Sequence, residues 1–179
     1  MKSGAAIAVA AAILVSGCDD ATVISHVDKM PNMKLDDLWT MQDGRGIPVE
    51  IHGQPFRTGS DLTLAEALRP PAGVAEGVKF YSAPVGTWKG GHAWRLVLHF
   101  NPRGGPNAYE DCKRDAEAVT NELPAEGYSV NVSFCKADEW QAHGFLKVLK
   151  GDGSDTQAYS DAMATLMSAI FQDDPGDQR

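Results

Sequence analysis

The stretch "AWRLVLHF", residues 93–100, is the clearest structural signal in this chain of 179 residues. Its alternate positions are large and apolar: Trp94, Leu96, Leu98, Phe100. The positions between them are mostly polar: Arg95, Val97, His99. Strict alternation is typical of a β-strand with one face buried. The stretch therefore predicts a strand whose apolar face packs against helices.

Patterns on both sides of this stretch predict four further strands. They lie at residues 47–52, 78–83, 128–134 and 140–149, and the third of them, "YSVNVSF", alternates as cleanly as 93–100. Pro48 cannot donate a hydrogen bond to a neighbouring strand, so 47–52 is expected at a sheet edge or to have Pro48 near its beginning. The last strand has competing apolar phases, because Trp140 and Ala142 compete with Phe145.

Apolar positions at three- and four-residue spacing predict helices between these strands. A short turn is expected at residues 35–41, a short helix within 60–69 with a capping box at Thr63 and Glu66, and longer helices at 107–123 and 154–170. We expect Asn107 to cap the third of these and Ser154 the last.

Together these patterns predict an α+β fold, with an antiparallel or mixed sheet of about five strands and two main helices packed on one face. The order of elements in the second half is β-α-β-β-α, which is that of a ferredoxin-like unit.

The N-terminus has a different pattern. Lys2 is followed by an almost purely apolar run, Ala5 to Val15, and then by "SGCDD", residues 16–20. A charge, an apolar run of roughly 7–15 residues and small residues at its end are typical of a secretory signal peptide. The run is too short to span a membrane, which takes about 20 residues.

The residues Val15-Ser16-Gly17-Cys18 resemble the lipobox of bacterial lipoproteins. The resemblance covers about the first 20 residues and implies cleavage before Cys18 and attachment of acyl chains to that cysteine. It implies a membrane lipoprotein that faces the periplasm. Asp19 favours the inner over the outer membrane, as in enterobacterial lipoproteins. The alternative is an ordinary cleaved signal peptide with a chance cysteine.

The predicted organisation has four parts. These are a signal peptide at 1–17, a lipidated N-terminus and flexible tether at 18–35, one α+β domain at 36–171, and a disordered tail at 172–179. The remaining cysteines, Cys112 and Cys135, form an even pair in an exported chain and are expected to form a disulfide. Two separate buried thiols are the alternative. Cys112 belongs to the apolar stripe of its helix, whereas Cys135 alternates to the other side of the sheet from Phe134, so the pairing requires strand 128–134 to end or bulge there.

Composition excludes one class of partner. The chain holds 16 Lys and Arg against 24 Asp and Glu, for a net charge of −8. No basic patch points to nucleic acid. The membrane contact is expected through the Cys18 lipid, and an envelope protein is the expected partner.

No motif for a catalytic nucleophile, a metal or a cofactor is present in the sequence. The candidate binding surface combines Trp88 and Arg103 in loops with polar side chains of the sheet: Arg95, His99, Asn131, His143. An exposed or loop-covered polar sheet face without a ligand is the alternative for the last four.

Three functions remain open. The first is a lipid-anchored, non-catalytic binding or assembly module of the cell envelope. The second is a glycan-binding domain, because the β-α-β-β-α order of residues 94–170 is similar to that of peptidoglycan-binding SPOR domains. The third is a hydrolase that uses His99 or His143 with a carboxylate.

Overall fold

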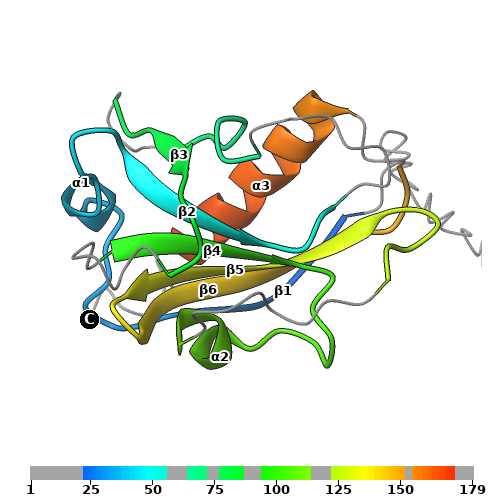
Figure 1. Cartoon of the computed structure of the whole chain (residues 1–179), viewed down its shortest axis with the longest axis horizontal. Helices are drawn as coiled ribbons and strands as arrows, with labels where there is room; N and C mark the ends of the chain where they lie inside the picture. The colour runs from blue at the N-terminus through cyan, green and yellow to red at the C-terminus, as the bar shows by residue number, and fades with distance from the viewer. Residues whose placement is uncertain are drawn as a thin grey trace, which may run out of the picture.

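The computed structural model describes residues 22–55, 64–71, 77–86, 94–113, 122–151 and 155–171. These residues form one mixed sheet of six strands with helices on both faces (Figure 1). The α+β class and the mixed sheet are confirmed, with one strand more than the five expected. No helix in these ranges is long and apolar enough to cross a membrane.

The strands lie in the order β1-β6-β5-β4-β2-β3. Their bounds are β1 Thr22–Lys29, β2 Ile47–His52, β3 Phe80–Ser82, β4 Trp94–Phe100, β5 Tyr128–Lys136 and β6 Glu139–Val148. β2 pairs in parallel with β3 and β4, and the other pairs are antiparallel. The predicted strand 93–100 is described from residue 94 and forms β4 up to Phe100, and β3 is shorter than the predicted 78–83.

β2 is not an edge strand, because β3 and β4 flank it. Pro48 is its second residue, and the registered pairing with β4 begins one residue later, at Val49. The missing N–H therefore falls at a strand beginning, which was the other position expected for this proline.

The expected flexible tether 18–35 is wrong in its middle, because Thr22–Lys29 is the edge strand β1, paired with β6. The sequence of β1 alternates only weakly between apolar and polar residues. Its side chains are exposed or half-buried, so polar residues are tolerated on both of its faces. The pairing shifts register between Ser25 and Asp28, where His26 takes a positive φ of 51°.

Helix α3, Thr156–Phe171, covers one face of the sheet, which we call the α3 face. The main core lies between them and joins the apolar alternate positions of β4, β5 and β6 to those of the helix. Its central members are Leu96, Leu98, Val130, Val132, Phe134, Met163, Leu166 and Ile170. Asp155 caps α3, because its carboxylate accepts from the N–H groups of Gln157 and Ala158. The expected cap, Ser154, lies outside the described residues.

Helix α2, Ala108–Lys113, lies on the opposite face, here called the α2 face. Two main helices on one face is therefore a wrong expectation, and so is the ferredoxin-like arrangement. β4 and β5 are direct antiparallel neighbours, whereas the ferredoxin-like unit needs a strand between them. Asn107 caps α2 as expected, by accepting from the N–H of Glu110 at 3.2 Å. Residues 114–121 of the predicted helix lie outside the described residues.

The disulfide between Cys112 and Cys135 is present, with Cα atoms 5.5 Å apart. Phe134 faces the main core, while Cys135 packs with Val97 and Cys112 in a small second core. The alternation along β5 is therefore intact, and the position of α2 on the other face is what permits the bond. An extra residue, Gln141, lies between the partners Cys135↔Trp140 and Phe134↔Ala142, which explains the mixed phases of β6.

Two short segments complete the description. Helix α1, Asp37–Thr40, forms within the expected turn. The helix predicted within 60–69 is described only from residue 64, and there the backbone forms a turn at 64–67. The capping residue Thr63 lies outside the described residues.

Candidate functional site

Four residues of the expected binding surface share the α2 face: Arg95, His99, Asn131, His143. The strand register brings them together, because His99 pairs with Asn131 and the next position of β5, Ser133, pairs with His143. However, the side chains of Arg95, His99 and Asn131 are buried and His143 is half-buried. A polar surface is therefore wrong for the first three residues, which form part of the protein interior close to α2.

Of the two loop residues expected in that surface, the structure describes Arg103. Arg103 is exposed beyond the C-terminal end of β4, past Phe100. Trp88 lies outside the described residues.

Arg95 forms a buried ion pair that the sequence did not predict. Its Nε lies 3.2 Å from Oε2 of Glu50, and the two side chains are 1% and 0% exposed. The guanidinium also donates to the carbonyl oxygens of Cys112 and Ala137. Burial lowers the pKa of Arg95, while the charge and hydrogen bond of Glu50 oppose that change. Arg95 thus ties together β2, the end of α2 and the turn between β5 and β6.

A second polar group links α2 to the sheet. His99 Nδ1 lies 2.8 Å from Oδ1 of Asp111, and the amide of Asn131 donates to the other oxygen of the same carboxylate. The side chains of His99 and Asp111 are 4% and 2% exposed. The ring of His52 lies 6.0 Å from that of His99.

A histidine bonded to a carboxylate is the pair that general acid–base chemistry uses. Such a pair must reach a substrate, and this one lies beneath the helix that supplies Asp111. The hydroxyl of Ser133 on the same face is buried and accepts from Asn131 at 3.3 Å. In this arrangement the carboxylate orients His99 and Asn131 and holds α2 on the sheet. Asp111 was missed because nothing in a helix sequence indicates that an acidic side chain turns toward a sheet.

His143 lies at the edge of this cluster, on β6, the strand between β5 and β1. Burial lowers its pKa, and the nearby His26 lowers it further, whereas Asp28 and Asp111 act in the opposite direction. Its ring meets the edge of Trp140 at 5.2 Å. Its Nδ1 has no hydrogen-bond partner among the described residues. Within those residues no three His, Cys, Asp or Glu side chains are placed to hold a metal ion.

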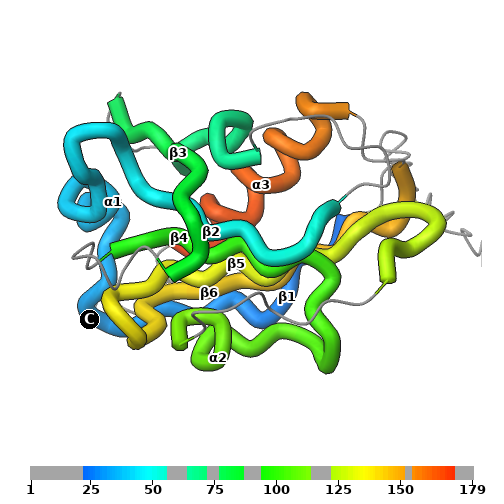
Figure 2. The backbone as a smooth tube through the Cα atoms, in the orientation of Figure 1, coloured from blue at the N-terminus to red at the C-terminus, as the bar shows by residue number. Residues whose placement is uncertain are grey.

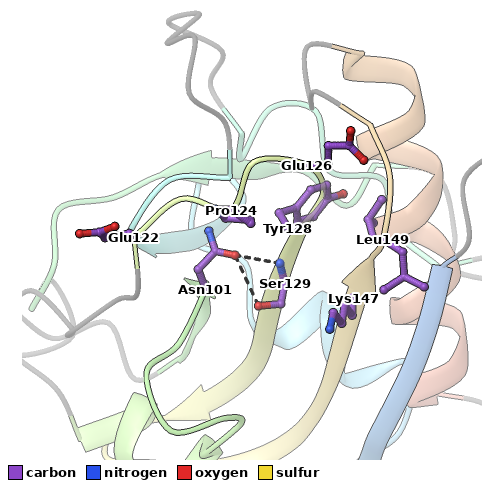
Figure 3. Close-up of a pocket in the computed structure, with 9 residues that line it drawn as sticks. Asn101, Glu122, Pro124, Glu126, Tyr128, Ser129, Lys147 and Leu149 are labelled. Carbon is purple, nitrogen blue, oxygen red and sulfur yellow. Dashed lines mark hydrogen bonds between the residues drawn. The ribbon is translucent and has the colours of Figure 1, made fainter.

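A pocket of about 400 Å³ lies elsewhere, where β5 begins and β6 ends (Figure 3). Its lining residues are Asn101, Glu122, Pro124, Glu126, Tyr128, Ser129, Lys147, Val148 and Leu149. The pocket contains none of the residues expected from the sequence. It was missed because three loops and strand ends, distant in the sequence, meet only in the folded chain.

The base of the pocket is held by backbone geometry. Asn101, at a positive φ of 49°, accepts from the N–H of Ser129 at 2.9 Å and donates to the carbonyl of Gln54. Gly127 has a φ of 68°, and a Cβ there would lie 2.1 Å from the carbonyl oxygen of Val148. Only glycine fits that approach.

The polar groups at the pocket differ in charge. Glu122, Glu126 and Lys147 are exposed, and Tyr128 is buried with its ring at the pocket wall (Figure 3). The site thus combines two carboxylates, one ammonium and an aromatic ring. Comparison of the chain with protein families, with curated proteins and with solved structures found no match.

Proposed function

We propose that this chain is a lipid-anchored protein of the bacterial cell envelope that acts as a non-catalytic binding or assembly module. The observation that carries the proposal is the leader with Val15-Ser16-Gly17-Cys18 at its end. These residues lie outside the described ranges, so the support is the sequence pattern. Acyl chains on Cys18 contribute about 0.8 kcal/mol per buried CH₂, and two or more chains make an anchor stable.

The disulfide between Cys112 and Cys135 is consistent with a location in the cell envelope. Disulfides persist in oxidising compartments such as the periplasm and are rare in the cytosol. The three cysteines of the chain then divide by role: Cys18 carries lipid, and Cys112 and Cys135 bond to each other. Asp19 favours retention at the inner membrane.

A binding role is favoured over catalysis by the state of the histidine–carboxylate pair. His99 and Asp111 are buried against α2, so the hydrolase alternative has no exposed acid–base group in this pair. The glycan-binding alternative rested on the order of elements along the chain. Because β4 and β5 are direct antiparallel neighbours, the ferredoxin-like arrangement that this order suggests is not formed.

The anchor is tested by labelling growing bacteria with an alkyne analogue of palmitate. Wild-type protein is expected to carry the label, and Cys18→Ser is expected to lose it. The matched control is Cys112→Ala with Cys135→Ala, which removes the other two cysteines and should keep the label. Wild-type protein without label would contradict the proposal.

The assembly role is tested by crosslinking in intact membranes followed by purification of the full-length, lipidated chain. We expect an envelope protein to be recovered with the wild type, and in lower yield with Trp88→Ala. If Trp88→Ala recovers the same partner in the same yield, the expected role of Trp88 is wrong. If the wild type recovers no envelope protein, the assembly role is wrong.

A further inference from the structure

The lipid anchor and the fold together restrict how the domain sits on the membrane. Strand β1 begins at Thr22, four residues after Cys18. An extended chain covers at most about 3.6 Å per residue, so Thr22 lies within roughly 14 Å of the Cys18 backbone. The headgroup layer of one leaflet is itself about 5–7 Å thick. The N-terminal end of β1 therefore has to lie at the bilayer surface.

The same end of the sheet exposes apolar side chains. Val23 is 47% exposed and Leu149 is 43% exposed, and both are among the few large hydrophobic residues with such exposure in the described chain. They are neighbours in space because Thr22 and Val148, the residues next to them, are partners in the β1–β6 ladder. Apolar side chains that cluster on a surface are typical of interaction sites.

Charges at this end do not oppose a membrane. Lys147 and Lys150 are exposed on either side of Leu149, and the long stems of lysines extend along apolar surfaces with the charge in the headgroup layer. Glu122 and Glu126 line the adjacent pocket and balance these two lysines. These four side chains therefore carry no net charge together, although the chain as a whole is acidic.

We propose that the end of the sheet formed by Val23 and Leu149, with the pocket beside it, rests on the lipid bilayer. This inference rests on the proposed lipid anchor and adds an orientation to it. The bilayer is the occupant because the chain between Cys18 and Thr22 is too short to place another protein domain between this end and the headgroups. The opposite end of the sheet, which carries α1 (Figure 2), then points away from the membrane.

Site-specific labels on the full-length lipidated protein test the orientation. Acylation blocks Cys18 and the disulfide blocks Cys112 and Cys135, so an introduced cysteine is the single free thiol. Fluorophores are placed by Val23→Cys or Leu149→Cys, and the matched control is Asn32→Cys. Asn32 is exposed and follows the far end of the same strand, whose last residue, Lys29, lies about 20 Å from Val23 at 3.3 Å per residue.

The labelled proteins are reconstituted in vesicles of phosphatidylethanolamine and phosphatidylglycerol that contain a lipid-borne nitroxide quencher. We expect quenching to remove most of the fluorescence at positions 23 and 149 and almost none at position 32. If positions 23 and 149 stay bright on vesicle-bound protein, or if position 32 is quenched instead, the orientation is wrong while the anchor stands. Mass spectrometry that finds no acyl chain on Cys18 would overturn both.

Discussion

The buried pair of Arg95 and Glu50 allows the sharpest test of the structure. The substitution Arg95→Met keeps most of the side-chain volume and removes the charge, which leaves Glu50 buried without its cationic partner. Breaking a buried ion pair by removing one partner costs about 3–5 kcal/mol. Domains of this size unfold with about 5–15 kcal/mol, so this single change is expected to remove a large share of the stability.

A double variant separates the effect of the stranded carboxylate from that of the two carbonyls to which Arg95 also donates. Adding Glu50→Leu to Arg95→Met removes the stranded carboxylate, and replacing both partners by apolar groups is often neutral or better. The carbonyls of Cys112 and Ala137 still lose a charged donor, at about 1.5–3 kcal/mol for each such bond. Both variants lose these two bonds, so we expect the double variant to be more stable than Arg95→Met by about 3–5 kcal/mol, the cost of the stranded carboxylate, and still less stable than the wild type.

Urea unfolding at neutral pH, followed by tryptophan fluorescence and circular dichroism, measures these differences. The control is Arg69→Met, because Arg69 and Asp161 form an ion pair with side chains 55% and 59% exposed. Pairs of that kind contribute about 0–1 kcal/mol. The reasoning is refuted if Arg95→Met costs no more than the control, or if adding Glu50→Leu lowers the stability further.

Three other predictions concern the two faces of the sheet. The Cys112–Cys135 bond closes a loop with a sequence separation of 23, so its reduction is expected to lower the free energy of unfolding by about 3.4 kcal/mol. Urea unfolding with and without dithiothreitol measures this difference, and equal midpoints would contradict the prediction. Gly144→Ala would place a Cβ 2.8 Å from Leu166 Cδ1, so we expect a loss of about 1–3 kcal/mol from overpacking in the same assay, and an unchanged midpoint would exclude such close packing of α3 on β6. Burial lowers the pKa of His143, so the unfolded chain takes up its proton first: stability should fall as pH drops below about 6.5, and His143→Gln should fall less steeply; parallel pH profiles of the two proteins would show that His143 does not contribute.

The agreement between sequence and structure is best where one strand face is apolar. The position of β4 follows from alternation, because its alternate apolar residues Leu96, Leu98 and Phe100 lie in the main core. The prediction fails for β1, where an edge strand with solvent on several sides does not require alternation. It also fails for Glu50, since a carboxylate on a strand gives no local sign that an arginine 45 positions later meets it.

Some features of the candidate site were predicted from the sequence, and others were not. The sequence identified Arg95, His99, Asn131 and His143 as a group, and the register confirms that they share one face. It did not predict that Asp111 lies beneath α2 against two of them, or that a pocket lies at Asn101 and Tyr128. Those features depend on segments that meet only after folding.

By itself, the sequence determined the alternation of the strands from β2 onward and the division of β5 into two opposite sets of side chains. Local stereochemistry is sufficient for these, because alternation and spacing are properties of neighbouring residues. Only the tertiary structure decided that α2 and α3 lie on opposite faces, and hence that polar side chains expected at a surface are interior. The face that a helix covers depends on the path of its connecting segments and on contacts such as that of Arg95 with the carbonyl of Cys112, which no local pattern encodes.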